Sequence, residues 1–276
     1  MAGEQEQWQL DGSAPELYQR YLVPAVTAAW AEDLVDRAAV SQGERVLDAA
    51  CGTGVVAHVA AERVGASGRV DALDLNPGML AVARSLPAAA WAPIAWHEGS
   101  VLALPFVDGS FEVVLCQFGL QFFPDRPAAL REIRRVLVST GRLALSVFGP
   151  IEHNPATHAL SNALDRHVDE GASVTKRTEH ALADAEGLRA LVAEAGFSDV
   201  RLHTATKLVR FPSVAEYVRV QLAATPLAGV IGGYDAERRG RLTRALTEDV
   251  GAALAQYVDA GGLTFPQEVH VVLASA

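Results

Sequence analysis

Two acids and two glycines in the first third of the chain could together bind a nucleotide. Asp48 ends an apolar run, Gly52 and Gly54 follow it, and Asp74 ends a second apolar run. Glycine allows a sharp turn and a close approach of the backbone to a ligand. A carboxylate at the end of a parallel strand accepts the hydroxyls of a ribose. The pattern therefore predicts a ribose-binding pocket built from strands, tight loops and helices.

The glycine loop also fits a dinucleotide-binding fingerprint, because residues 52–57 read G-x-G-x-x-A and Asp74 follows at the expected distance. This pattern leaves a nicotinamide-dependent oxidoreductase open. Asp48 separates the two interpretations, since a carboxylate there repels a pyrophosphate and attracts a cation. The ligand implied has a ribose, no phosphate and a positive charge near the first loop. S-adenosylmethionine has all three properties.

Five segments resemble the class I S-adenosylmethionine-dependent methyltransferases. Residues 46–54 resemble the first motif of that family, and the later segments follow in the right order. The resemblance is closest to the methyltransferase type 11-like branch, which acts on small molecules in biosynthesis. It is good over residues 43–149 and only architectural beyond Pro150. The later segments are 72–80, 98–106, 111–118 and 130–137.

The resemblance implies transfer of a methyl group from S-adenosylmethionine to an oxygen, nitrogen or carbon of a small organic molecule, of the kind made in secondary metabolism. Two alternatives stay open. One is the nicotinamide-dependent oxidoreductase that would use Gly52 and Gly54. The other is a protein that binds the cofactor but catalyses a reaction without methyl transfer, such as a cyclisation.

Roles for the cofactor-binding residues also come from the resemblance. Asp48 orients its loop and faces the methionine part, Asp74 binds the ribose, and Leu75 packs on the adenine. Ser100 stands where many relatives have an acid, so its hydroxyl or the Val101 backbone meets the adenine. The residues expected to contact the cofactor are Tyr21, Asp48, Ala50, Gly52, Gly54, Asp74, Leu75, Met79, Ser100, Val101, Gln117 and Phe118.

Acceptor-binding residues are expected near the end of the fourth strand and beyond the fifth. Tyr18, Gln121, Phe122 and His158 are the candidates for contact with the acceptor. An oxygen or nitrogen nucleophile needs a base, and His153, just after the fifth strand, is the candidate for that role. No set of His, Asp and Glu residues has the spacing of a metal site.

These residues need an α/β fold to position them: a Rossmann-like sheet of seven mostly parallel strands with the last strand antiparallel. We expect one domain whose cofactor-binding core is residues 43–149. The other parts are N-terminal helices (1–42), two helical insertions that form a substrate cap (150–185 and 213–262), and the rest of the sheet (186–212 and 263–276). Within them, strands are predicted at 142–148, 200–209 and 269–273, helices at 214–224 and 241–258, and a Gly-rich link at 229–233.

Composition agrees with a small-molecule enzyme. The formal charge of −10 argues against nucleic acid as a partner, because tracking a phosphate backbone needs clusters of Lys and Arg. Two cysteines are too few for a disulfide framework. The acidic stretch 1–7 lacks the features of a signal peptide, and no uncharged run reaches the length of a membrane span. The sequence thus predicts a cytoplasmic protein with a small-molecule acceptor and no membrane contact.

Overall fold

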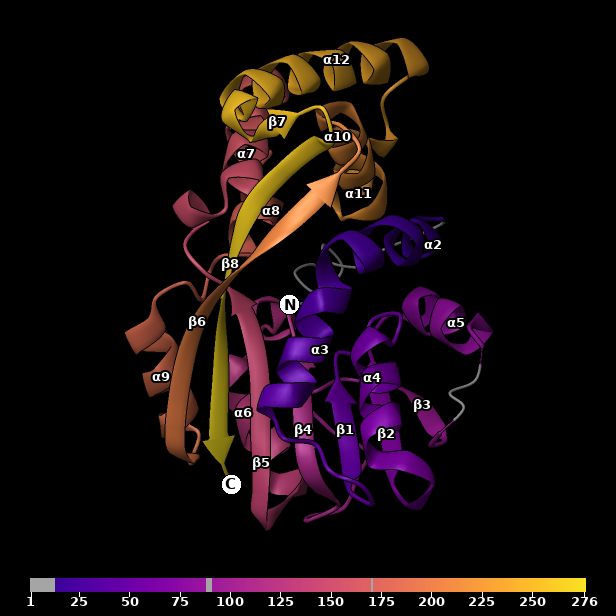
Figure 1. Cartoon of the computed structure of the whole chain (residues 1–276), viewed down its shortest axis with the longest axis vertical. Coiled ribbons are helices and arrows are strands. Elements are labelled where there is room, and N and C mark those ends of the chain that lie inside the picture. Colours follow the sequence, from indigo (N-terminus) through magenta and orange to yellow (C-terminus); the bar gives the residue numbers. More distant parts are fainter. Residues whose placement is uncertain (1–12, 88–90, 170) are drawn as a thin grey trace.

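A twisted eight-stranded sheet forms the centre of the protein (Figure 1). The computed structural model describes residues 13–87, 91–169 and 171–276. Along the sheet the strand order is β3-β2-β1-β4-β5-β8-β6, and β7 pairs with β8. The strands are β1 (Arg45–Ala49), β2 (Arg69–Asp74), β3 (Ile94–Glu98), β4 (Phe111–Gln117), β5 (Leu137–Phe148), β6 (Ser198–Phe211), β7 (Val258–Asp259) and β8 (Gly262–Ser275).

The strand directions confirm the predicted fold class. The first five strands run parallel to one another, and β8 lies antiparallel between β5 and β6. Reversal of the strand order at β1 and β4 creates a switch point, and open α/β sheets bind ligands at such points. The two-residue strand β7 is an addition that the sequence pattern did not predict.

The last two long strands continue past the sheet as a two-stranded ribbon. β5 pairs with β8 only over Val269–Ser275, whereas β6 pairs with β8 as far as Leu263. The prediction of a strand at 269–273 therefore found only the part of β8 that lies deep in the sheet. In Figure 1 the ribbon rises from the sheet toward the helices of the cap.

Helices of the core cover both faces of the sheet. An N-terminal run of helical turns packs beside β4 and β5, and its middle part, η1, is a π-helix that contains Pro24. Side-chain caps start three of the core helices: Asn76 accepts two backbone N–H groups at the start of α5, and Asp125 and Asp184 accept one each at the starts of α6 and α9. These elements are α2 (Ala14–Leu17), η1 (Tyr18–Thr27), α3 (Ala28–Arg37), α4 (Val55–Val64), η2 (Gly65–Ser67), α5 (Pro77–Ser85), η3 (Leu120–Phe122), α6 (Arg126–Val136), η4 (Ile151–His153) and α9 (Ala185–Glu194).

A second group of helices forms a cap with its own apolar core. Leu160, Leu246 and Phe211 belong to this core, which is separate from the two clusters that flank the sheet. The cap helices are α7 (Pro155–His167), α8 (Val174–Thr178), α10 (Val214–Ala224), α11 (Leu227–Gly232), α12 (Ala236–Ala253) and η5 (Ala255–Tyr257).

Two predictions about the second insertion are wrong. The Gly-rich stretch 229–233 lies mostly in α11 and is not an open link. The long helix begins earlier than residue 241, because Asp235 caps it by accepting from the Arg238 N–H, and it ends before Val258, which lies in β7. Among the described residues, no helix combines the length and apolar character needed to cross a membrane.

Candidate functional site

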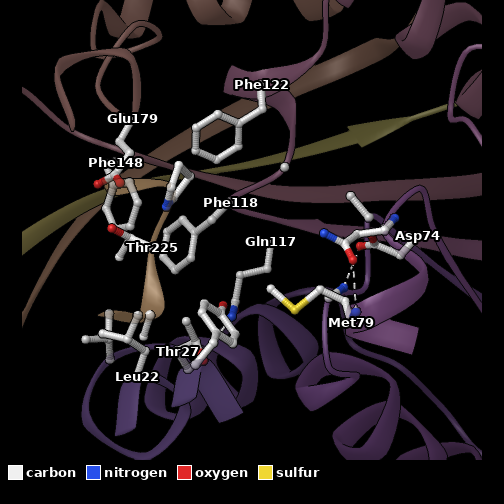
Figure 2. A pocket seen from close by; sticks show the side chains of 18 of the residues that line it. Leu22, Thr27, Asp74, Met79, Gln117, Phe118, Phe122, Phe148, Glu179 and Thr225 are labelled. Carbon is white, nitrogen blue, oxygen red and sulfur yellow. Dashed lines mark hydrogen bonds between the residues drawn. The ribbon is translucent and has the colours of Figure 1, made fainter. Parts of the chain in front are cut away.

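A cavity of about 310 Å³ lies where β1, β2 and β4 end, between the core and the cap. Figure 2 shows Asp74 and Met79 on one side, Glu179, Phe148 and Thr225 on the other, and Gln117 and Phe118 between them. Core and N-terminal residues that line it are Tyr18, Leu22, Val26, Thr27, Ala50, Gly52, Leu73, Asp74, Leu75, Asn76, Met79, Gly99, Ser100, Val101, Leu102, Gln117, Phe118, Gly119, Phe122, Phe123, Pro124 and Phe148.

The first loop brings backbone close to the cavity. Ala50 and Gly52 line it with left-handed backbones, at φ +62° and +56°. A Cβ added at Gly52 would meet no atom within 4 Å, so this face of the loop is open to a ligand. Gly54 is different, since its added Cβ would lie 2.4 Å from the Trp96 ring. Gly54 thus permits close packing on β3 and does not line the cavity.

Asp48 is buried beneath this loop. Its Oδ2 accepts the Ala57 N–H at 2.9 Å, and its Oδ1 has no hydrogen-bond partner among the described residues. Burial, reinforced by the negative charge of Asp74, raises the pKa of Asp48 to about 8. A cation nearby would offset this cost of burying the charged carboxylate. Asp48 is therefore placed to act on the cavity through its loop and its charge, and not as a lining residue.

Asp74 holds the first two loops together and also lines the cavity. Its Oδ2 accepts the Gly52 N–H at 2.7 Å, and its Oδ1 accepts the Asn76 N–H at 2.8 Å. A carboxylate oxygen can accept more than one hydrogen bond, so Asp74 can also accept from a ligand hydroxyl. Burial raises the pKa of Asp74 as well. The donors and acceptors present thus fit a ligand with a ribose diol and a positive charge.

Gln117 and Phe118 connect the two sides of the cavity. The Gln117 Nε2 donates to the Thr27 carbonyl at 3.0 Å, which ties the N-terminal helix to β4, while its Oε1 is buried with no described partner. Phe118 has a left-handed backbone, at φ +53°, and its ring stacks on Phe148 at 4.2 Å between centroids. The stacked pair forms a flat aromatic surface in the cavity wall.

The structure brings most of the predicted cofactor residues together and leaves three outside the lining. Asp48 is buried beneath the first loop, and Gly54 packs against Trp96 of β3. Tyr21 turns toward the cap, where the Arg219 guanidinium lies 4.6 Å from its ring centroid. The predicted residues that do line the cavity are Ala50, Gly52, Asp74, Leu75, Met79, Ser100, Val101, Gln117 and Phe118.

Of the predicted acceptor residues, only Tyr18 and Phe122 line the cavity. Burial raises the pKa of Tyr18 to about 12, so its phenol is a hydrogen-bond donor at neutral pH. Gln121 is buried and donates to the Phe118 carbonyl at 2.9 Å, and His158 lies half-buried on α7. Neither side chain reaches the lining.

The geometry does not place His153 where a base is needed. Its side chain is 59% exposed, and its Nδ1 lies 2.9 Å from the Glu268 carboxylate, which raises the pKa of His153. His153 lies in the short turn η4 and does not line the cavity, which its distance from β5 in the sequence could not reveal.

The cap contributes a set of polar and aromatic residues that sequence reasoning missed. Tyr217 and Gln221 are spaced four apart on one face of α10, and Thr225 directly follows the last residue of this helix. The four-residue spacing is visible in the sequence, but only the folded structure shows that these residues line the cavity. The cap and ribbon residues in the lining are Thr157, Lys176, Glu179, Phe211, Tyr217, Gln221, Ala224, Thr225, Pro226, Phe265 and Gln267.

The sheet order, with its antiparallel strand β8 and the cavity at the switch point, defines a Rossmann-like fold of the methyltransferase type. A crystal structure from Bacillus halodurans, named as a methyltransferase, has this fold with a TM-score of 0.59. The two chains are 22% identical, and the match covers 90% of this chain and 98% of that one.

The sequence profile of the ubiE/COQ5 methyltransferase family matches residues 25–211, and the chain belongs to this family. It is 36% identical over 148 residues to a 2-phytyl-1,4-naphthoquinone methyltransferase of Thermosynechococcus vestitus, covering 54% of this chain and 64% of that protein. It is 32% identical over 182 residues to the chloroplastic 2-phytyl-1,4-beta-naphthoquinone methyltransferase of Arabidopsis thaliana, covering 61% of this chain and 70% of that protein. The chain spans about half to two thirds of the length of most of the curated relatives that it matches.

Proposed function

We propose that this protein transfers a methyl group from S-adenosylmethionine to a ring carbon of a small hydroxylated aromatic acceptor of the quinol type. The observation that carries the proposal is a single cavity with two chemically different ends. At one end Asp74 lines the cavity and Asp48 is buried beneath the loop beside it, and the other end is walled by aromatic rings, among them Phe118 and Phe148. Membership of the ubiE/COQ5 family supports the reaction type.

The acidic end suits the cofactor. The open backbone at Gly52 and the Asp74 carboxylate would hold the ribose, and the exposed Leu75 would cover the adenine. Asp48 would balance the positive charge of the methionine part through the loop above it. When bound, the cofactor supplies an electrophilic methyl group. Alignment of the two reactants by such a site contributes about 7 to 11 kcal/mol to lowering a reaction barrier.

The acceptor end suits a flat ring. Phe118 and Phe148 stack with an interplanar angle of 7°, and offset stacking on such a surface favours an aromatic guest. The apolar wall continues through Phe122, Phe211 and Phe265. The curated relatives named above are naphthoquinone methyltransferases, and the same acceptor class is assigned to this chain as part of the proposal. Residues 212–276, which include α10, α11 and α12, lie outside the matched family region, whereas α7 and α8 lie inside it.

The test is transfer of a labelled methyl group. Purified protein is incubated with methyl-labelled S-adenosylmethionine and 1,4-dihydroxynaphthalene kept reduced under anaerobic conditions. We expect label on a ring carbon of the product, together with saturable binding of S-adenosylhomocysteine. Saturable NAD(H) binding without S-adenosylhomocysteine binding would instead support the oxidoreductase. Cofactor binding without label transfer to this acceptor or related hydroquinones would contradict the proposed reaction.

A further inference from the structure

The acceptor end of the cavity contains a buried ion pair that comes entirely from the first insertion. Lys176 lies on α8, and Glu179 is the residue that ends this helix. The Lys176 Nζ donates to the Glu179 Oε1 at 2.6 Å and to the Gln221 Oε1 at 2.9 Å. The exposed fractions of the Lys176 and Glu179 side chains are 5% and 15%. Burying two charges is costly, which makes a purely structural role a poor explanation for their place in the cavity wall.

Glu179 has one carboxylate oxygen available to a ligand. Its Oε1 accepts from Lys176, and no described residue donates to its Oε2. Figure 2 shows Glu179 on the same side as Phe148 and Thr225, away from Asp74. Among the described residues that line the cavity, Asp74 and Glu179 are the two carboxylates, and Asp74 already accepts two backbone N–H groups at the cofactor end. Glu179 is therefore the acid available to the acceptor.

The other titratable groups around Glu179 are less suited to accept a proton. Lys176 is a cation that pairs with it, and burial raises the pKa of both Tyr18 and Tyr217, so both phenols stay protonated near neutral pH. His180 is buried beside Phe148 and outside the lining, and its Nδ1 lies 2.6 Å from the Gly149 carbonyl. These groups face Glu179 from α8, the N-terminal helix, α10 and the turn after α8.

We propose that Glu179 is the general base of the reaction and accepts the hydroxyl proton of a phenolic acceptor. This inference rests on the proposed function. The O–H bond breaks, its proton moves to Glu179, and the oxygen electron pair passes into the ring. The adjacent ring carbon then forms a bond to the methyl group, while the methyl–sulfur bond breaks and its electron pair stays on sulfur. Finally the ring carbon loses its proton to water, and Glu179 returns its proton to the oxygen, so one proton is released overall.

Lys176 acts as the positioning residue for Glu179. Its contacts to Glu179 and Gln221 join α8 to α10, so the base is fixed between two elements of the cap. Thr225 directly follows α10, and its Oγ1 donates to the Gln221 carbonyl at 2.5 Å. The ligand class assigned to this end of the cavity is thus a flat ring that carries an ionisable hydroxyl.

The experiment compares Glu179→Gln with Glu248→Gln, a change at an exposed glutamate on α12. Near neutral pH, Glu179→Gln should lower kcat by about 100-fold or more, as expected for loss of a general base. Its affinity for S-adenosylhomocysteine should stay within about twofold of the parent protein, because the cofactor end is untouched. Glu248→Gln should retain full activity, and Glu179→Asp should recover part of the lost rate.

The pH profile distinguishes a base from a structural residue. In alkaline buffer the acceptor hydroxyl ionises without help, so the deficit of Glu179→Gln relative to the parent protein should shrink steadily as the pH rises. The dimethyl ether of 1,4-dihydroxynaphthalene, which has no hydroxyl proton, should not be methylated by any variant. Absence of label transfer in the parent protein would overturn the proposed function itself. Transfer by the parent with equal rates in both Gln variants, or with a deficit that is constant across pH, would overturn only the role of Glu179.

Discussion

Two non-glycine residues with left-handed backbones lie where the first and fourth strands end. Ala50 and Phe118 have φ values of +62° and +53°, and both line the cavity. Such a conformation costs of order 1 to 3 kcal/mol and persists only when the surrounding structure enforces it. Gly119, which follows Phe118 in the turn after β4, allows the two turns to approach, because a Cβ there would lie 2.9 Å from the Ala50 Cβ. These two strained turns therefore lie side by side in the cavity wall.

The two glycines of the first loop should respond differently to the same substitution. Gly54→Ala adds about 1 to 2 kcal/mol for a left-handed alanine and about 1 to 3 kcal/mol for overpacking against Trp96, since the new Cβ would lie 2.4 Å from that ring. Gly52→Ala adds only the backbone cost, because its Cβ would meet no atom within 4 Å. We therefore expect a clear loss of stability in Gly54→Ala and a smaller one in Gly52→Ala, measured by urea unfolding.

The effect on cofactor affinity should be the reverse, with Gly52→Ala affected more than Gly54→Ala. Gly52 faces the cavity, so its new methyl group would occupy space that the cofactor needs. Calorimetric titration with S-adenosylhomocysteine should therefore show weaker binding to Gly52→Ala than to folded Gly54→Ala. Equal affinities in the two variants would mean that the open face of Gly52 is not the cofactor face.

At the level of elements, prediction succeeded where local sequence signals agree with the tertiary structure. The helix predicted at 214–224 has the bounds of α10, because Ser213 caps it by accepting from the Glu216 N–H. The loop residues after β1 and β2 were found because glycines and acids at strand ends form a local pattern. The acceptor site was harder to predict, since Lys176 and Gln221 are distant in the sequence and meet only when the ribbon of β6 and β8 carries the cap over the cavity.

A substitution in the apolar core of the cap should destabilise the cap without disturbing the cofactor site. Leu246 on α12 is fully buried in the cap core, whereas Leu208 on β6 is 62% exposed. Leu246→Ala should cost about 2 to 5 kcal/mol, the usual range for a buried leucine, and Leu208→Ala should stay within about 0.5 kcal/mol of the parent protein. Hydrogen exchange should show faster opening of α7 and α12, which pack together, in the first variant only.

Cofactor affinity and methyl transfer, measured in the same two variants, distinguish the two ends of the cavity. Leu246→Ala should keep its affinity for S-adenosylhomocysteine, because the residues of the first two loops belong to the core, and should lose methyl transfer as the acceptor end opens. A parallel loss of cofactor affinity would show that the cap and the core unfold as one unit.

For the molecule as a whole, the buried acids couple stability to ligand charge. Asp48 and Asp74 both lie near the first loop, and burial raises the pKa of each. The protein already carries a formal charge of −10, so neutralising a buried carboxylate by protonation, or balancing it with a cationic ligand, reduces an unfavourable electrostatic energy. The ligand-free protein should therefore be sensitive to pH in a range where most carboxylates are fully ionised.

Asp48→Asn tests this coupling through the pH dependence of unfolding. An aspartate in the unfolded chain has a pKa of about 3.9, and the pKa of Asp48 in the folded protein is about 8. Between these values the native state holds one proton more than the unfolded state. The free energy of unfolding therefore falls as the pH rises, by at most about 1.4 kcal/mol per pH unit from this residue. Asparagine does not titrate, so the variant should gain stability relative to the parent protein between about pH 5 and pH 8, as measured by urea unfolding without ligand.

The difference between the two unfolding curves reports on Asp48 and on its electrostatic coupling to Asp74. A difference that stays constant across this pH range would show that Asp48 remains ionised in the folded protein. A cation would then have to balance this buried charge, although the Asp48 Oδ1 has no hydrogen-bond partner among the described residues. A difference that grows with pH would instead explain why a cationic cofactor binds here: it offsets the free-energy cost of ionising a carboxylate that the fold has removed from water.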